Sequence, residues 1–170
     1  LGTLGQPSIL INNAAYSING DYSSLDAKIL DDHYAVNMRS TFLLCAEFAR
    51  LFKSSNLPYG RIVNLTSGQD LAPMAGELAY AATKGAIPAF TRSLSQELAP
   101  LHITVNAVNP GPTDSTWMDD EIRGYLLPQF PMGRIGTPQD AANLVAFLVS
   151  EEAGWITGQI IHSEGGFMRG

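Results

Sequence analysis

Four short apolar runs, with long helical patterns between them, are the feature that most restricts the fold of this chain. The runs cover residues 8–12, 62–65, 102–108 and 159–162. Helical patterns cover about 26–54 and 77–99, and another begins at 137. Runs this apolar are typical of strands buried on both faces of a parallel sheet. The order therefore predicts a parallel sheet with right-handed crossovers and helices on both faces, a doubly wound α/β fold.

The most polar and glycine-rich positions follow the ends of the expected strands. They are Asn12-Asn13, Ser67, Asn109-Pro110-Gly111 and Glu164-Gly165-Gly166. Ligands of open α/β sheets bind beyond the carboxyl ends of the strands. One rim of the sheet is therefore expected to carry the functional site.

Composition excludes several classes of protein. The 170 residues, 45 % hydrophobic, suit one domain. A net charge of -6 without a basic cluster argues against nucleic acid as a partner. The single cysteine, Cys45, cannot form an internal disulfide and is interpreted as a core residue. No apolar run reaches the ~20 residues of a membrane span, so we expect a cytoplasmic protein without a membrane partner. The histidines share no metal-ligand spacing, so no metal is expected.

Tyr80 and Lys84 share one face of the second helix, because they lie four residues apart. A phenol has an ordinary pKa of about 10, and a neighbouring ammonium is expected to lower it. Ser67 lies thirteen residues before Tyr80, at a strand end. By itself the pair has an alternative interpretation as an ordinary solvated helix pair, and Ser67 as a turn-capping hydroxyl. Together, the three indicate proton transfer to a carbonyl oxygen.

With further motifs in the same order, the chain resembles the short-chain dehydrogenase/reductase family over essentially its whole length. The matching residues are Asn12-Asn13-Ala14, Val36-Asn37-Met38, Ser67, Tyr80, Lys84 and Asn109-Pro110-Gly111. Within the family, the stretch from Asn109 to Trp117 looks most like bacterial 3-oxoacyl-carrier-protein reductases. The resemblance implies the C-terminal four-strand portion of a Rossmann-type sheet.

The same resemblance implies an NAD(P)-dependent enzyme that interconverts a ketone and a secondary alcohol, with 3-oxoacyl thioesters as candidate substrates. Tyr80 exchanges the proton, Lys84 supports it, and Ser67 binds the carbonyl oxygen. Asn37 belongs to the family's proton relay, through a water held by its backbone. An alternative interpretation of Asn37 is a polar helix residue tolerated by packing.

The cofactor residues are also implied by the resemblance. Tyr80 and Lys84 contact the nicotinamide ribose, and three further groups of residues match cofactor-lining segments. These are Asn13, Ala14 and Ala15 at the first strand end, Pro110, Gly111 and Thr113 beside the carboxamide, and Ser115 or Thr116 as a hydroxyl contact. NADP or NAD is expected, and the preference between them stays open.

The sequence departs from the family pattern in two important ways. Pro88 lies inside the second helix and removes the hydrogen bond to the carbonyl of Lys84. We therefore predict a kink there, with that carbonyl free for water or a ligand. The glycine-rich turn that grips the cofactor's pyrophosphate is absent from the 170 residues. The chain is thus expected to be one truncated domain that begins at the family's fourth strand.

Two expectations concern what surrounds the site. Residues 111–137 are rich in Pro, Gly and large apolar side chains, and are interpreted as a substrate lid. An alternative interpretation is that these apolar side chains belong to the core. The first helical segment is apolar around most of its circumference, which favours a homodimer or homotetramer. A rival hypothesis is that the chain is a non-catalytic, oligomerising remnant of such an enzyme.

Overall fold

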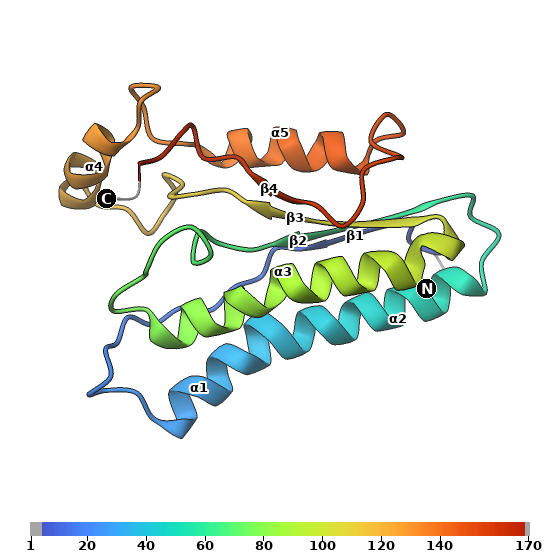
Figure 1. The fold of residues 1–170 in the computed structure, drawn as a ribbon, viewed down its shortest axis with the longest axis horizontal. Coiled ribbons are helices and arrows are strands. Elements are labelled where there is room, and N and C mark those ends of the chain that lie inside the picture. The colour runs from blue at the N-terminus through green and yellow to red at the C-terminus, as the bar shows by residue number, and fades with distance from the viewer. Residues whose placement is uncertain (1–4, 169–170) are drawn as a thin grey trace.

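A computed structural model describes residues 5–168 of the chain. Its four strands form one parallel sheet in the order β1-β2-β3-β4 (Figure 1). The strands are β1 (Ile9–Asn12), β2 (Gly60–Leu65), β3 (Ile103–Asn109) and β4 (Ile160–His162). The predicted α/β fold with a parallel sheet is confirmed, and each expected strand lies within one or two residues of its predicted position.

Helices lie on both sides of this sheet. α2 and α3 cover one face and α5 the other, while α4 lies beyond the carboxyl ends of the strands (Figure 1). The helices are α1 (Ala27–His33), α2 (Thr41–Lys53), α3 (Leu78–Leu98), α4 (Asp120–Leu126) and α5 (Pro138–Val149). No helix within residues 5–168 has both the length and the apolar character that crossing a bilayer requires.

Side-chain caps explain where two of the helices begin. The Asp26 carboxylate accepts a hydrogen bond from the backbone N–H of Ile29 at 2.8 Å, which starts α1. At the start of α5, the backbone N–H and hydroxyl of Thr137 both donate to the Asp140 carboxylate, at 2.7 and 2.8 Å. Pro138 then occupies the first helical position, where its missing N–H costs no hydrogen bond.

The first helical segment is interrupted by a π-helical stretch, η1 (Tyr34–Ser40), between α1 and α2. The sequence predicted one helix over about 26–54, and helical periodicity does not reveal one extra residue in a turn. Asn37 lies in the middle of η1. Since π-turns inside helices often occur at functional sites, this one draws attention to Asn37.

Two apolar clusters hold the layers together. The first joins α2 and α3 to the sheet and contains Cys45, Phe48, Phe52, Ile62, Leu98, Ile103 and Val105. The second joins α5 to the other face through Val63, Val108 and Leu148. Cys45 is buried as expected, and burial raises the pKa of its thiol to about 12. A thiol with this pKa stays protonated and behaves as a small core residue.

One expectation about β1 is wrong. The sequence predicted a strand covered on both faces, yet Ile9 and Ile11 are 42 % and 45 % exposed. Leu10, which points to the opposite face, packs against the cluster under α2 and α3. The reason is that α5, the helix on the outer face, packs on β2 and β3. The outer face of β1 therefore has no helix over it within the described residues.

The predicted lid over 111–137 is partly helical. α4 and a 3-10 turn (Leu127–Gln129) lie inside it. Met118, Leu126 and Phe130 are buried in a small cluster of their own, while Trp117 and Tyr125 are 55 % and 74 % exposed. The apolar residues of this segment thus divide between a local core and an open surface.

Candidate active site

The three reacting side chains predicted from the sequence come from two adjoining elements. Ser67 follows the carboxyl end of β2, and Tyr80 and Lys84 lie on the first two turns of α3. The Ser67 hydroxyl forms a hydrogen bond with the Tyr80 phenol that lowers the pKa of that phenol. The Lys84 ammonium lies 5.9 Å from the centre of the Tyr80 ring. The structure therefore brings these three residues together.

Lys84 is an almost fully buried cation. Its side chain and backbone together are 3 % exposed, and its Nζ donates a hydrogen bond to the backbone carbonyl of Leu65 at 2.8 Å. Burial lowers the pKa of Lys84 to about 8, because a charged ammonium loses its hydration there. A group with this pKa can gain or lose a proton near neutral pH.

The expected lowering of the Tyr80 pKa is not seen. The pKa of Tyr80 is raised, first because the phenol is buried and further because the Glu77 carboxylate lies nearby, while the Ser67 hydrogen bond acts against both. The ammonium of Lys84 is directed at the Leu65 carbonyl and not at the Tyr80 phenol. In this structure Lys84, and not Tyr80, is the member of the pair that titrates near neutral pH.

The buried ammonium predicts a pH-dependent stability. Between about pH 8 and pH 10, the unfolded chain keeps the Lys84 proton whereas the folded chain releases it, so the folded state binds fewer protons. The free energy of unfolding should therefore rise with pH in this window, by about 1–3 kcal/mol relative to Lys84→Met, which cannot titrate. Urea denaturation of both proteins over this range measures the difference. A difference that stays flat, or falls, would contradict the prediction.

The side-chain amide of Asn37 forms hydrogen bonds that link three segments of the chain. Its Nδ2 donates to the carbonyl of Tyr16 at 2.8 Å and to the Thr83 hydroxyl at 3.0 Å. Its Oδ1 accepts from the backbone N–H of Tyr16 at 2.8 Å. The side chain thus joins η1 to the segment after β1 and to the residue before Lys84. A role in a proton relay would fall to its backbone and stays a prediction.

The carbonyl of Lys84 is not free, contrary to the expectation from Pro88. α3 continues through Pro88 from Leu78 to Leu98. The Thr66 hydroxyl donates a hydrogen bond to the Lys84 carbonyl at 3.2 Å and so replaces the N–H that proline lacks. The sequence did signal the unpaired carbonyl, but the donor comes from a strand end and could not be identified by spacing.

The turn after β3 is held by Glu164, which follows β4. Gly111 has a φ of +64°, and a Cβ at this position would lie 2.5 Å from the Cβ of Glu164. The backbone N–H of Gly111 donates to Asn109 Oδ1, and Asn109 Nδ2 donates to Glu164 Oε2, both at 2.9 Å. Glycine is therefore required here both by conformation and by space.

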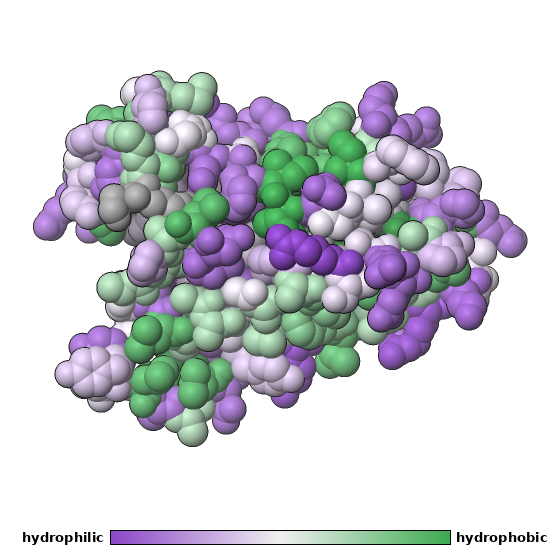
Figure 2. Space-filling model, in the orientation of Figure 1, coloured by the Kyte–Doolittle hydropathy of each residue, from purple (hydrophilic) through white to green (hydrophobic). Residues whose placement is uncertain are grey.

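The predicted cofactor residues line the same rim of the sheet with different exposure. Asn13, Ala14 and Ala15 are exposed after β1, and Pro110, Gly111, Thr113 and Ser115 are half-buried after β3. The Thr113 hydroxyl is turned back onto the carbonyl of Gly111 at 3.2 Å. Thr116 is exposed, so the choice between Ser115 and Thr116 stays open. The outline of the molecule is indented at this end, between the lid and α1 (Figure 2).

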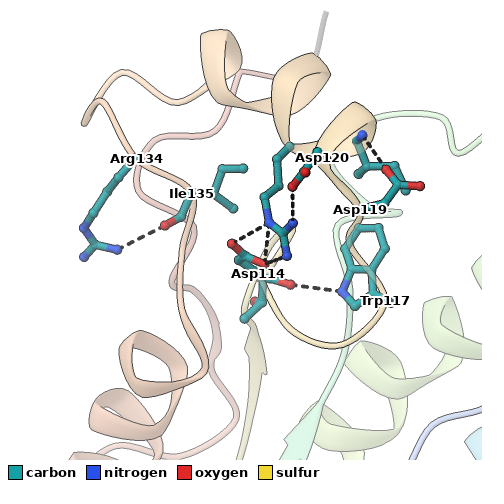
Figure 3. A network of polar contacts seen from close by, with 9 residues as sticks. Asp114, Trp117, Asp119, Asp120, Arg134 and Ile135 are labelled. Carbon is teal, nitrogen blue, oxygen red and sulfur yellow. Dashed lines mark hydrogen bonds and ion pairs between the residues drawn. The ribbon is translucent and has the colours of Figure 1, made fainter.

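Within the lid, a polar network ties α4 to the segment just after the Gly111 turn (Figure 3). The guanidinium of Arg123 on α4 contacts both carboxylate oxygens of Asp114, with its Nε 3.0 Å from Oδ2, and reaches Asp120 at 2.8 Å. The indole N–H of Trp117 donates to the carbonyl of Thr113 at 2.9 Å. α4 is thereby tied to the residues that follow the Gly111 turn.

A buried polar network beneath the site was missed by sequence reasoning. Asn12 Nδ2 donates to Asn64 Oδ1 at 2.8 Å, and Asn64 Nδ2 donates to the Thr91 hydroxyl at 3.0 Å. The network crosses from β1 through β2 to α3. The asparagines inside apolar strands were its visible signal, but their partners depend on the parallel register of Asn12 with Asn64.

The sheet, the strand-end site and the Tyr80–Lys84 pair can be set beside known proteins. A family model described as enoyl-(acyl carrier protein) reductase matches residues 2–168. The chain belongs to the short-chain dehydrogenase/reductase family. Among curated members, an uncharacterized oxidoreductase of Bacillus subtilis, YjdA, is 79 % identical over 98 % of this chain. The 3-oxoacyl-[acyl-carrier-protein] reductase FabG of Aquifex aeolicus is 41 % identical over 93 % of it. The chain spans 66 % and 64 % of the length of these two relatives.

Solved structures of this family share the fold. A short-chain dehydrogenase/reductase mutant of Serratia marcescens superposes with a TM-score of 0.88 at 34 % identity, over 98 % of this chain and 67 % of its own. The angucycline C-6 ketoreductase LanV, with bound NADP, gives 0.85 at 33 % identity over 94 % and 62 %. A 4-hydroxyisoleucine dehydrogenase complexed with NADH gives 0.87 at 27 % identity over 97 % and 70 %.

Proposed function

We propose that this chain carries the proton-transfer half of an NAD(P)-dependent oxidoreductase that interconverts a ketone and a secondary alcohol. The observation that carries the proposal is the buried Lys84 ammonium, with a pKa of about 8, one helical turn from a phenol that is hydrogen-bonded to Ser67. Perturbed groups that converge on a strand-end rim are typical of catalytic sites. Membership of an oxidoreductase family supports the reaction class.

Each side chain has a defined task in this proposal. The carbonyl oxygen of the substrate binds between the hydroxyls of Ser67 and Tyr80. In reduction, the Tyr80 phenol gives its proton to that oxygen, and in oxidation it takes the proton back. The Ser67 hydroxyl donates a hydrogen bond to the same oxygen as negative charge develops on it. Lys84 holds positive charge close to the phenol and stabilises the phenolate left after transfer.

The cofactor supplies or accepts the hydride when it is bound. In this proposal Lys84 and Tyr80 contact the nicotinamide ribose, and Asn13, Ala14 and Ala15, which are exposed after β1, line it. The Pro110-Gly111 turn, whose backbone approach is kept open by glycine, fits the carboxamide. These residues suit the nicotinamide end of NADP or NAD. Pyrophosphate would need a glycine-rich turn, and the sequence contains none.

The proposed substrate is a small carbonyl compound or its alcohol. A 3-oxoacyl thioester is the first to test, since FabG relatives are named for that substrate. We also propose that the chain forms homodimers or homotetramers. Leu43 and Leu44 on α2 are 60 % and 52 % exposed, which supports contact of that helix with a second copy.

A fluorescence titration with NADPH separates this proposal from the rival, a non-catalytic oligomerising module. We expect saturable binding by the 170-residue chain, weakened about tenfold to a hundredfold in Lys84→Ala, because a charge-assisted hydrogen bond to the ribose is lost. Lys53→Ala, at the exposed end of α2, is the matched control and should bind like the wild type. Absence of binding would favour the module and confine the activity to a longer form of the protein.

A further inference from the structure

Pro88 leaves one backbone carbonyl of α3 without its usual hydrogen-bond donor. In an α-helix the carbonyl of Lys84 accepts from the N–H of residue 88, and proline has none. Both residues are buried, with Lys84 3 % exposed, so water cannot easily replace the missing donor. A buried carbonyl in this position needs another partner.

Thr66 supplies that partner from outside the helix. Its hydroxyl donates to the Lys84 carbonyl at 3.2 Å and accepts from Gln69 Nε2 at 3.3 Å. Its own backbone N–H donates to the carbonyl of Val108 on β3 at 2.9 Å, so its position is fixed by the sheet. Thr66 is itself 3 % exposed. The hydrogen bond therefore ties a rigid strand end to one particular turn of α3.

The same strand end also holds the other end of Lys84. Leu65, the residue before Thr66, accepts the Lys84 ammonium at 2.8 Å through its backbone carbonyl. Two consecutive residues of the β2 end thus grip the main chain and the side chain of one lysine. A helix with an ordinary residue at position 88 would satisfy its own carbonyl and would have no need of the first of these bonds.

We propose that Thr66 is a positioning residue for Lys84: its hydroxyl, which accepts from Gln69 and donates to the carbonyl left free by Pro88, fixes the turn of α3 that holds the ammonium at the Leu65 carbonyl, 5.9 Å from the centre of the Tyr80 ring. The catalytic importance of Thr66 rests on the proposed function, but the two hydrogen bonds by which Thr66 and Leu65 hold Lys84 do not. A test that needs neither substrate nor cofactor therefore separates failure of the grip from failure of the proposed activity.

The test is an NMR pH titration of protein labelled with 13C at the lysine Cε. The chain has three lysines, Lys28, Lys53 and Lys84, so the resonance missing from Lys84→Arg identifies Lys84. In Thr66→Val we expect the Lys84 midpoint to rise from about 8. The rise should be on the order of half a pH unit, because a displaced turn lets water reach the ammonium. Thr66→Ser keeps the hydroxyl and should titrate like the wild type.

Pro88→Ala distinguishes positioning from mere satisfaction of a carbonyl. In the double variant Pro88→Ala/Thr66→Val, the backbone N–H gained at position 88 can bond the Lys84 carbonyl within the helix, so thermal stability should recover. The Lys84 midpoint should nevertheless stay raised relative to Pro88→Ala, because the tie to β2 is gone. This pair also serves if Thr66→Val alone does not fold.

Two results would overturn the proposal. One is a wild-type midpoint in Thr66→Val or in the double variant. The other is a double variant that does not fold although Pro88→Ala does, because a role in folding would then account for Thr66. If the titrations behave as expected and NADPH does not bind, the positioning role of Thr66 is supported and only the proposed activity fails.

Discussion

Tyr80→Phe is expected to lower the turnover of a ketone with NADPH about 10²- to 10⁴-fold, the range that one positioned general acid contributes. Phenylalanine keeps the ring and its packing but has no proton to give to the carbonyl oxygen. The Ser67 hydroxyl remains and can still hydrogen-bond the substrate, so KM should change much less than kcat. Steady-state oxidation of NADPH, followed by absorbance, measures both constants.

The matched control for this prediction is Tyr59→Phe. The Tyr59 phenol donates to Glu151 at 3.1 Å, and Tyr59 precedes the amino end of β2, at the opposite end of that strand from Ser67. Tyr59→Phe also removes one phenolic hydroxyl and should leave turnover unchanged. Equal losses in the two variants, or a Tyr80→Phe protein with wild-type turnover, would show that Tyr80 is not the proton donor.

The sequence was a good guide where local chemistry decides the structure. The helix starts expected near 26 and at 137 agree with the structure, because the caps formed by Asp26 and by the Thr137–Asp140 pair act within one turn. The parallel arrangement of the strands followed from the alternation of strands and helices, since parallel strands require crossovers. Tyr80 and Lys84 share a helix face for the same local reason, which is why half of the candidate site could be located by spacing alone.

Features that depend on distant partners were harder to predict. The π-helical stretch around Asn37 differs from an α-helix by one residue per turn, which apolar periodicity does not resolve. Whether Ile9 and Ile11 are covered depends on where α5 packs. The pKa of Tyr80 depends chiefly on burial, which outweighs the Ser67 hydrogen bond, and the Glu77 carboxylate adds a smaller rise. The donor to the Lys84 carbonyl is Thr66, eighteen residues away in the chain. Each of these is set by tertiary contacts.

The buried polar network through Asn64 should contribute strongly to the stability of the fold. Asn64 is 0 % exposed and joins Asn12 on β1 to Thr91 on α3. Asn64→Leu should lower the free energy of unfolding by about 2–4 kcal/mol, because it leaves buried polar groups on both neighbours without this partner. Urea denaturation measures the loss. Thr104→Val is the control, since the buried Thr104 hydroxyl has no hydrogen-bond partner within residues 5–168, and removing it should cost less than about 0.5 kcal/mol.

A double-mutant cycle with Asn12→Leu tests whether the network acts as one unit. Once Asn64 is gone, the Asn12 amide has lost its 2.8 Å acceptor, so replacing it as well should cost much less than it does in the wild type. The coupling should exceed about 0.5 kcal/mol, and additive losses would mean that the two asparagines act independently. Asn12 immediately precedes the rim residue Asn13, and Asn64 lies three residues before Ser67 on β2. Loss of the network should therefore also disturb the strand ends that carry the candidate site, beginning with the hydrogen bond between Ser67 and Tyr80.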